Sequence, residues 1–469
     1  MIAAENLSSL TSALSGKLVG DDAPVTSISI DTRTLEPGQL FVAIKGPNFD
    51  GHNYVQAALD KGAAGVLVSR PVDSFPHILV DDTEEALTQT GILNRKAFKG
   101  TVFGVTGSSG KTSVKEMLAA IFSQVAPTLS TNGNFNNAYG VPLTLARLTS
   151  EHQFAVIEMG TNSPGEIEHL TNIVQPHISI VNNASCSHVA GLGGLMGVVQ
   201  EKGAIFDQLP KDGCAVVNLD DEHHPIWLER IRQNAGCRIM TFSHASQEAN
   251  AWAGDVVTEE NGMHFTLHLE EKETPVHLQF WGRHQVTNAC AAATIAKAAG
   301  LDIETIAAGL GQAHPYARRG QRFRTHHGAM VIDQSYNANS DSTRAAIDEL
   351  AECDGYRILV MGDLSAEHYL DEEDGIRMHR ELGEYALNAG IDRVLTSGTI
   401  SAHAHTGFQK DGEHFADKSD LITWLQTHLK QGVVALVKGA NASGMNKVVS
   451  ACLSENHEAP SVATTTEGA

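Results

Sequence analysis

Short apolar runs alternate along the chain with segments whose apolar residues recur every three or four positions. The runs at residues 101–105, 178–181 and 433–437 are almost continuously apolar, which is typical of strands buried on both faces of a parallel sheet. The segments between such runs have the spacing of amphipathic helices. This alternation of strand and helix predicts an α/β fold built on parallel sheets.

The pattern divides the chain into three domains and a tail. Residues 1–98 predict a small α/β domain, and residues 99–313 predict a central parallel-sheet domain whose stretch 252–280 has the period-two alternation of antiparallel strands. Residues 314–454 predict a Rossmann-like, doubly wound α/β domain. The polar tail 455–469 is expected to be disordered. The predicted strands lie at 25–30, 39–44, 65–68, 101–105, 154–157, 178–181, 214–217, 330–333, 357–361, 393–395 and 433–437, and predicted helices lie at 54–61, 113–124 and 342–352.

Composition narrows the possible classes of function. The chain has 469 residues, which is more than one core supports, and its 42% hydrophobic and 19% charged residues are typical of a soluble globular protein. The formal charge of −22 argues against nucleic acid or an anionic membrane surface as the main partner. With no apolar run of 18 residues and no basic leader, we expect a cytoplasmic protein without stable membrane insertion. The six scattered cysteines predict reduced, buried thiols.

The segment 107–112, with the sequence GSSGKT, lies between a predicted strand and a predicted helix. A glycine-rich turn at such a junction directs backbone N–H groups and a helix N-terminus toward one point, which suits a polyphosphate. Because Val105 stands where the full P-loop pattern has glycine, this is a shortened loop. An incidental glycine turn is the weaker interpretation. The predicted nucleotide-binding residues here are Gly107, Ser108, Ser109, Gly110, Lys111 for the outer phosphates, and Thr112 for a magnesium ion.

Two residues farther along the chain, Glu158 and His188, are candidates for metal chemistry. Glu158 ends a predicted strand, so it would face the ligand crevice of a parallel sheet and hold a second magnesium ion, or it would cap the next turn. His188 follows the next strand and would share that metal as a neutral imidazole, although a hydrogen-bonded loop histidine is the commoner outcome. Lys202 lies on a predicted helix, where a solvated surface lysine is the ordinary expectation.

Two polar loops and two single residues add candidates for ligand binding. Residues 131–137 are rich in glycine and asparagine and form either a substrate loop or a plain connection. Residues 333–339 follow a strand and place several amide and hydroxyl side chains in one turn. Asn288 would contact an adenine edge or cap a helix, and Lys438, at the end of the last strand, would meet an anion.

Taken together, these segments resemble the Mur ligase family. In the family's order, the shortened loop is followed by G-N-F-N-N at 133–137, I-E-M-G at 157–160, G-x-H with Asn288, S-Y-N-A-N at 335–339 and L-V-K-G at 436–439. The first part agrees, with D-T-R at 31–33 and F-D-G-H at 49–52. The resemblance covers residues 20 to 450. Within the family, the S-Y-N-A-N signature is similar to that of members that add D-alanyl-D-alanine to UDP-N-acetylmuramoyl-tripeptide.

The resemblance implies an ATP-dependent ligase of cytoplasmic peptidoglycan precursor synthesis. ATP would bind between the central and third domains and pass its γ-phosphate to the terminal carboxylate of the UDP-linked peptide. The amine of D-alanyl-D-alanine would then attack the acyl phosphate, giving an amide, ADP and phosphate. The implied cofactors are ATP and two Mg²⁺ ions, and the expected assembly is a monomer.

The resemblance also implies roles for individual residues. Lys111, His188 and Lys202 would be catalytic, and Lys202 would be carbamylated, which turns a cation into an anion that orients magnesium. The implied metal ligands are Thr112, Glu158, His188 and Lys202. The implied further nucleotide contacts are Asn288, Gln334 and Arg319 or Arg322, these two arginines being otherwise a basic linker. The implied substrate-binding residues are Asp31, Arg33, Gly46, Asn134, Asn136, Asn137, Tyr336, Asn337, Asn339 and Lys438.

The chain departs from the family pattern at several supporting positions. Gln334 replaces a usual aspartate, and an amide still hydrogen-bonds a ribose hydroxyl but brings no charge. Further departures are Ala138, Ala190, Ala204, Ala440 with Asn441, and the segment 364–369. Two alternatives therefore stay open: a sister amide ligase, which the S-Y-N-A-N signature disfavours, and a nucleotide-binding paralogue with weakened catalysis, which the retained Lys111, Glu158, His188 and Lys202 disfavour.

Overall fold

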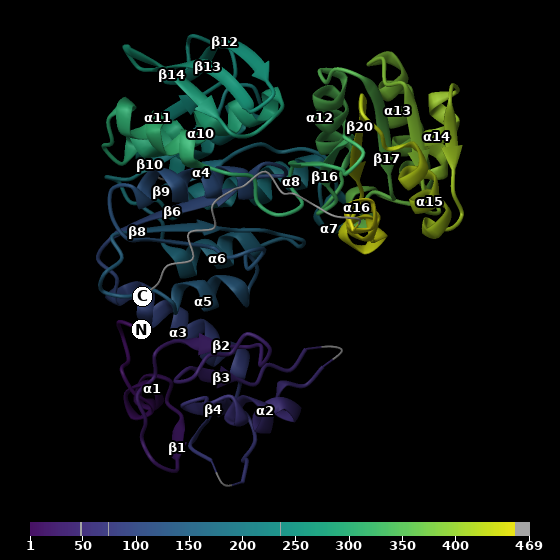
Figure 1. Cartoon of the computed structure of the whole chain (residues 1–469). Coiled ribbons are helices and arrows are strands. Elements are labelled where there is room, and N and C mark those ends of the chain that lie inside the picture. Colours follow the sequence, from purple (N-terminus) through teal and green to yellow (C-terminus); the bar gives the residue numbers. More distant parts are fainter. Residues whose placement is uncertain (47–48, 74, 235, 455–469) are drawn as a thin grey trace.

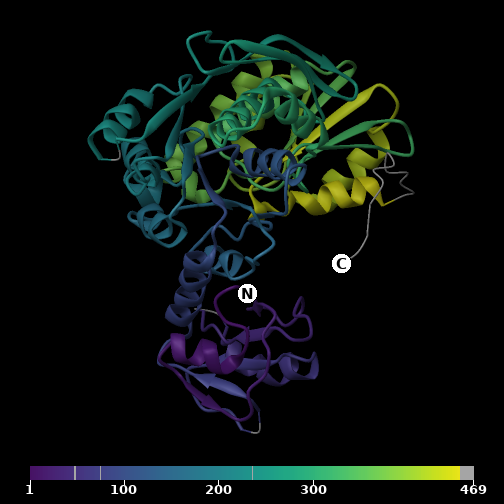
Figure 2. The same ribbon diagram turned by 90° about the vertical axis from the view of Figure 1, so that its left-hand side faces the viewer.

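Three bodies, each built on one β-sheet, make up the computed structural model, which describes residues 1–46, 49–73, 75–234 and 236–454 (Figure 1). The first body is set apart from the other two, and the helix α3 (Thr83–Ala97) lies between it and the second body (Figure 2). The tail at 455–469, predicted to be disordered, lies outside the described residues. Every described helix is too short or too polar to cross a membrane.

The first body contains a five-stranded sheet in the order β1-β5-β4-β3-β2. Only the pair β1–β5 is antiparallel. Apolar side chains of the sheet and of α1 fill its core. Asp82 is the N-cap of α3, and its carboxylate accepts hydrogen bonds from the N–H groups of Glu84 and Glu85. The elements are α1 (Leu7–Ala13), β1 (Lys17–Val19), β2 (Ile28–Ser29), β3 (Leu40–Val42), η1 (Gly51–Tyr54), α2 (Val55–Asp60), β4 (Gly65–Val68) and β5 (His77–Leu79).

The second body contains a nine-stranded sheet in the order β14-β13-β12-β11-β10-β9-β6-β8-β7. Strands from β7 to β12 pair in parallel, and β12, β13 and β14 pair antiparallel. The strands are β6 (Thr101–Thr106), β7 (Thr128–Ser130), β8 (Phe154–Glu158), β9 (Ile178–Val181), β10 (Cys214–Asn218), β11 (Arg238–Phe242), β12 (Ala251–Glu259), β13 (Gly262–Leu269) and β14 (Lys272–Leu278).

Helices cover both faces of this second sheet, so that it has two apolar cores. On one face the rings of Phe103, Phe122 and Phe154 stack, with centroids 4.4 Å apart for the first two and 4.6 Å apart for the last two, which fixes α4 against β6 and β8. The helices are α4 (Lys111–Ser123), α5 (Gly140–Leu145), α6 (Glu166–Val174), α7 (Val189–Leu192), α8 (Leu195–Gly203), η2 (Ala204–Phe206), α9 (His224–Asn234), α10 (Arg283–Ala298) and α11 (Ile303–Gln312).

The third body is a six-stranded doubly wound sheet in the order β15-β16-β20-β17-β18-β19, in which only β15 is antiparallel. Its strands are β15 (Gln321–Arg324), β16 (Met330–Gln334), β17 (Tyr356–Met361), β18 (Arg393–Thr396), β19 (Gly412–His414) and β20 (Val433–Lys438). Its helices are α12 (Ser340–Ala351), η3 (Ala366–His368), α13 (Glu372–Asn388), α14 (Ala402–Phe408), α15 (Lys418–His428), η4 (Asn441–Ser443) and α16 (Met445–Leu453).

The α/β architecture with parallel sheets is confirmed, and the predicted elements exist with shifted ends. The alternation at 252–280 forms the antiparallel strands β12 to β14, and along β13 buried and half-buried residues alternate because one face of this edge is covered. The strand predicted at 25–30 shrinks to Ile28–Ser29. Val25 is nevertheless buried, so its apolar side chain packs in the core without belonging to a strand. All six cysteines are free, but only Cys214 and Cys290 are fully buried.

Candidate active site

A cavity of about 580 Å³ lies between the second and third bodies. The loops that line it follow the carboxyl ends of β6, β8, β9 and β10 in the second sheet and of β16 and β20 in the third. The carboxyl edge of a parallel sheet is where ligands bind in doubly wound folds. Two such edges therefore supply the polar side chains of one cavity.

The glycine loop between β6 and α4 lines this cavity at Ser108, Ser109 and Gly110. Gly110 precedes α4 with φ of +80°, a conformation that favours glycine. A Cβ atom at this position would lie 2.4 Å from Asn182 Nδ2 and 2.5 Å from Asn288 Oδ1. Glycine is thus required here both by the backbone and by the close approach of two amides.

The loop after β9 supports the glycine loop through side-chain amides. Asn183 Oδ1 accepts a hydrogen bond from the Ser109 N–H at 2.8 Å, and Asn182 Nδ2 donates to the Ser109 carbonyl at 3.0 Å. Asn182 Nδ2 also donates to Asn288 Oδ1 at 2.9 Å. Asn288 lies within α10, whose N-cap is Gly282, so the alternative that Asn288 caps the helix is wrong. These contacts hold the glycine loop between β9 and α10.

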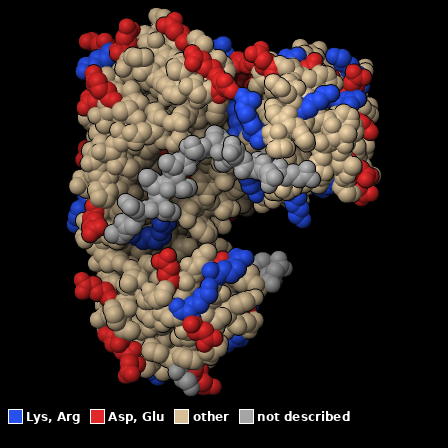
Figure 3. Space-filling model, in the orientation of Figure 1, with Lys and Arg blue, Asp and Glu red and all other residues tan. Residues whose placement is uncertain are grey.

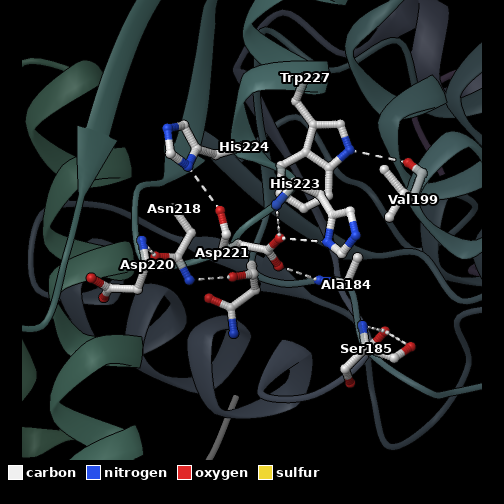
Figure 4. Close-up of polar contacts among 11 residues, drawn as sticks. Ala184, Ser185, Val199, Asn218, Asp220, Asp221, His223, His224 and Trp227 are labelled. Atoms are coloured by element: carbon white, nitrogen blue, oxygen red, sulfur yellow. Dashed lines mark hydrogen bonds and ion pairs between the residues drawn. The ribbon is translucent and has the colours of Figure 1, made fainter. Parts of the chain in front are cut away.

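The carboxylate of Asp221 holds the loop after β9 in place (Figure 4). Asp221 accepts a hydrogen bond from the Ala184 N–H at 2.7 Å, and its other oxygen accepts one from the His223 N–H at 2.9 Å. Nearby, Asn218 Nδ2 donates to the Asn182 carbonyl at 2.9 Å. The end of β10 therefore sets the path of the segment that supports the glycine loop.

Lys111 begins α4 and lines the cavity, with Nζ donating to the Gly107 carbonyl at 2.5 Å. Burial lowers the pKa of Lys111, and Arg319 lowers it further, while Glu158 opposes the shift. A cation held in this way, next to backbone N–H groups, favours a bound anion. Polyphosphate is the ligand whose charge and shape fit this combination.

Thr112 and Glu158 form a buried pair of oxygen donors beside the glycine loop. Thr112 Oγ1 donates to Glu158 Oε2 at 2.9 Å, and Asn136 Nδ2 donates to Glu158 Oε1 at 2.7 Å. Both Thr112 and Glu158 are 1% exposed. Hydroxyl and carboxylate oxygens next to a phosphate site are a donor set that suits Mg²⁺. Glu158 does not cap α6, which begins after Gly165.

Lys202 is buried, with 1% of its surface exposed, so the expectation of a solvated surface lysine is wrong. It lies in the last turn of α8. Trp227 fixes this helix, since its Nε1 donates to the Val199 carbonyl at 3.0 Å (Figure 4). Burial lowers the pKa of Lys202 well below that of a free lysine, and the nearby Lys111 cation lowers it further.

His188 lines the cavity from the loop before α7. Its Nδ1 lies 3.5 Å from Glu367 Oε2, a carboxylate that reaches over from η3 of the third body. The contact with His188 lowers the pKa of Glu367. Lys111, Glu158 and His188 therefore line one cavity, together with a third-body carboxylate.

The third body contributes arginines that stack on a tyrosine. The Arg319 guanidinium lies 3.9 Å from the centroid of the Tyr336 ring, and both residues line the cavity. Arg322 instead pairs with Glu349 at 3.1 Å and stacks on Trp281, with its guanidinium 4.4 Å from the ring centroid. Of the two arginines that the sequence left open, Arg319 is the one at the cavity.

Gln334 and Lys438 end neighbouring strands of the third sheet and lie at the cavity wall. Lys438 Nζ donates to the Asn337 carbonyl at 3.1 Å and lies 3.5 Å from Gln334 Oε1. Gln334 Nε2 donates to Glu349 Oε2 at 2.7 Å. Burial, with Arg319 nearby, lowers the pKa of Lys438 to about 7, and burial raises the pKa of Glu349. The side chain of Gln334 thus contacts both the buried Glu349 and the buried Lys438.

Comparisons with known proteins agree with this geometry. Three family models match: "Mur ligase family, catalytic domain" at residues 24–90, "Mur ligase middle domain" at 105–296 and "Mur ligase, glutamate ligase domain" at 318–441. The chain is 41% identical over 453 residues to UDP-N-acetylmuramoyl-tripeptide--D-alanyl-D-alanine ligase of Escherichia coli, covering 96% of this chain and 98% of that protein. The chain belongs to the Mur ligase family.

Further relatives and solved structures extend this result. The ligase of the same name from Bacillus subtilis is 33% identical, with 91% of this chain and 92% of that protein covered. A crystal structure of MurF from Acinetobacter baumannii superposes with a TM-score of 0.84 at 32% identity, covering 95% of this chain and 98% of that one. MurF ligase from Thermotoga maritima in complex with ADP shares the fold, with a TM-score of 0.77 at 24% identity over 91% and 97% of the chains.

Some predicted site residues of this Mur ligase line the cavity and others lie elsewhere. Asn134, Asn136, Asn137, Asn337 and Asn339 line it with the residues already described. The three residues assigned to the uridine nucleotide lie in or beside the first sheet, away from the cavity: Asp31, Arg33 and Gly46. Asp31 and Arg33 pair with each other at 2.7 Å, which also lowers the pKa of Asp31.

Several cavity residues were not predicted from the sequence. Asn182 and Asn183 directly follow a correctly predicted strand, so the rule that ligands bind at carboxyl ends would have identified them. Glu367 lies in the segment 364–369, where the chain departs from the family pattern, and this departure was the signal. Arg318 also lines the cavity, beside the predicted Arg319.

Proposed function

We propose that this Mur ligase uses ATP to join D-alanyl-D-alanine to UDP-N-acetylmuramoyl-tripeptide, as a cytoplasmic monomer in peptidoglycan precursor synthesis. The observation that carries the proposal is the end-to-end similarity to ligases of that name, at 41% identity over 96% of the chain. The cavity supports it, because a phosphate-binding loop on one sheet opposes a lysine, an arginine and amides on another. Such an arrangement suits group transfer between two bound substrates.

In the first step the terminal carboxylate of the peptide attacks the γ-phosphorus of ATP, giving an acyl phosphate and ADP. Catalysis of phosphoryl transfer is mainly positioning and neutralisation of charge. The glycine loop directs N–H groups at the phosphates, and Lys111 adds a positive charge at their outer end. On the third body, Arg319 and Lys438 supply further positive charge.

The buried oxygen pair of Thr112 and Glu158 fits a magnesium ion next to the phosphates. His188 would contribute a nitrogen to a second ion on the same side of the cavity. When bound, magnesium neutralises charge on the transferring phosphoryl group. The protein itself holds Glu158 in place, because Asn136 donates a hydrogen bond to its carboxylate.

In the second step the amine of D-alanyl-D-alanine attacks the acyl carbonyl carbon. The C–N bond forms and the amine nitrogen loses a proton, which the departing phosphate takes up. The tetrahedral intermediate collapses as the bond between carbon and the phosphate oxygen breaks and phosphate is released. Lys111 and the nearby backbone N–H groups offset the negative charge that develops during this step. Water exclusion by the two facing bodies protects the acyl phosphate from hydrolysis.

We assign the UDP group of the acceptor to the first body, through Asp31, Arg33 and Gly46. The molecule is hollowed between the first body and the third, and Lys and Arg side chains of the first body lie along this hollow (Figure 3). A long nucleotide-linked peptide can lie across this hollow with its terminal carboxylate in the cavity. The Arg33 side chain is 86% exposed, so it is accessible to an anion.

The test is a coupled assay of phosphate release with ATP, magnesium, UDP-N-acetylmuramoyl-tripeptide and each candidate amine. D-Alanyl-D-alanine should give turnover, while single amino acids and diamino acids should give little. The Lys111→Ala variant should lose at least about a hundred-fold in kcat, because it removes a charge that stabilises the transition state, and should keep the fold. Turnover with a diamino acid alone would refute the proposal, and ATP binding without turnover on any substrate set would indicate a binding paralogue.

A further inference from the structure

A histidine of the third body holds the backbone of a cavity residue on the second body. The His188 N–H donates to His368 Nδ1 at 3.0 Å, and the two rings meet edge to face with centroids 5.0 Å apart. His368 ends η3, and its side chain is 1% exposed. The bond joins residues 180 positions apart in the sequence, across the boundary between the two bodies.

His188 needs this support because of its backbone conformation. Its φ is +58°, in the left-handed region that residues other than glycine rarely adopt. It directly precedes α7, a helix of only four residues. A short helix and a strained entry residue do not hold each other in place, so an outside contact is required. His368 provides that contact.

The two ring nitrogens of His368 have different neighbours. Nδ1 accepts the His188 N–H, while Asn337 Nδ2 lies 3.5 Å from Nε2. Nε2 lies 3.7 Å from Glu367 Oε1, and the other oxygen of that carboxylate lies 3.5 Å from His188 Nδ1. The three side chains have ligand atoms within 4.8 Å of one another, a spacing that a metal ion can occupy. Nδ1 is already engaged by the His188 N–H, so the cluster fits a positioning role better.

We infer that His368 is a positioning residue that fixes the backbone of His188 only when the third body is seated on the second. The ring of His188 then faces the cavity beside Lys111 and Glu367. When the bodies separate, the His188 N–H loses its acceptor and the segment relaxes. The position of His188 in the cavity of the second body therefore depends on contact with the third body. The consequence for turnover rests on the proposed function, whereas the coupling itself does not.

The experiment compares His368→Leu with His368→Asn. Leucine removes the acceptor but fills space, whereas the asparagine Oδ1 can accept the same N–H. Hydrogen–deuterium exchange is measured in the full-length protein with an ATP analogue and magnesium, over the amides of residues 186–192. His368→Leu should raise exchange there about ten-fold or more, since a partly buried N–H loses its partner, and His368→Asn should stay within about three-fold of wild type.

The kinetics provide a second readout. His368→Leu should lower kcat about ten-fold or more while the KM values for ATP and D-alanyl-D-alanine change less than about three-fold, because the loss lies in positioning and not in binding. His177→Leu is the matched control, since its Nδ1 accepts the Val102 N–H at 2.9 Å at the opposite end of the second sheet. This control should not change exchange at 186–192.

Three results would overturn the inference. They are unchanged exchange at 186–192 in His368→Leu, equal exchange in the leucine and asparagine variants, and an equal rise in the His177→Leu control. If the wild-type protein shows no turnover with D-alanyl-D-alanine but the exchange pattern is as expected, the proposed function fails while the coupling stands. The same set of variants therefore distinguishes a failure of the proposed function from a failure of the coupling.

Discussion

At the scale of single residues, this acidic protein buries lysines at one place. The formal charge is −22, yet Lys111 and Lys438 face one cavity and Lys202 is buried close to Lys111. Burial lowers the pKa of all three, so each is held in an environment that penalises its charge. An anionic ligand would relieve that penalty. The residues thus make a local site for an anion that the average charge of the protein does not favour.

Lys438 gives a prediction about pH. Its pKa of about 7 lies below that of free lysine, so above pH 7 the empty protein holds it mostly neutral. A phosphate against Nζ favours the charged form and raises the pKa, so binding takes up a proton at pH 8. Nucleotide affinity should fall about ten-fold between pH 6.5 and 8.5. Calorimetry in buffers of different ionisation enthalpy measures both effects.

The control for Lys438 lies nearby. Lys438→Met should weaken binding and flatten its pH dependence, whereas Lys447→Met, at an exposed position of α16, should keep the wild-type profile. A pH profile in Lys438→Met as steep as that of the wild type would show that another group titrates.

Lys202 gives a prediction about chemical modification. Burial lowers the pKa of Lys202 and so favours its neutral amine, the form that reacts with CO₂ to give a carbamate. Lys202→Ala should therefore lose about a hundred-fold or more in kcat, as expected when a group that orients charge at the site is lost. Added short carboxylates should restore part of the activity, because they replace the missing anion. Normal activity in Lys202→Ala, or a deep loss that no carboxylate relieves, would exclude the carbamate.

At the scale of elements, the loop after β9 connects the glycine loop to the rest of the second body. Asn182 and Asn183 contact Ser109 directly, and Asp221 holds the segment from behind through the Ala184 N–H. Asp221 is 9% exposed, so water does not easily replace its carboxylate. The shape of the phosphate site thus depends on Asp221, which lies just after β10.

The corresponding prediction concerns Asp221. Asp221→Ala leaves the Ala184 N–H without its acceptor and lets the loop after β9 move, so the KM for ATP should rise about ten-fold while kcat changes less. Glu222→Ala removes the same charge at an exposed neighbouring position and should behave as wild type. Steady-state kinetics with both variants check this, and an unchanged KM in Asp221→Ala would separate this loop from nucleotide binding.

At the scale of the whole molecule, polar contacts join the second and third bodies both at the cavity and outside it. Thr258 and Arg283 reach Glu352 at 2.9 and 3.1 Å, and Asn339 Nδ2 lies 3.4 Å from Ser109 Oγ. Polar interfaces of this kind between domains permit relative motion. A nucleotide that bridges the two bodies would favour one relative position over others.

We therefore predict that a bound ATP analogue with magnesium compacts the protein. Small-angle scattering should show a smaller radius of gyration, because the third body closes on the second when both contact the ligand. Gly110→Val is the control, since its side chain would fill the space between Asn182 and Asn288 and block the glycine loop. Identical profiles with and without the analogue and peptide substrate in the wild type would contradict closure.

The sequence determined the order of strands and helices, the glycine loop and the family. Those features are local, because a buried parallel strand has a continuous apolar run and a phosphate loop has fixed spacing over six residues. The sequence also placed Glu158 and Lys438 at strand ends, where the structure has them.

Only the tertiary structure decided which of the other polar residues meet. It places Lys202 in the interior. It puts Arg319 at the cavity, whereas Arg322 pairs with Glu349. It also brings Gln334 into contact with both Glu349 and Lys438. It also joined His188 to a histidine 180 residues away. Such contacts depend on how three separately folded sheets pack, and packing between distant segments leaves no periodic signal along the chain.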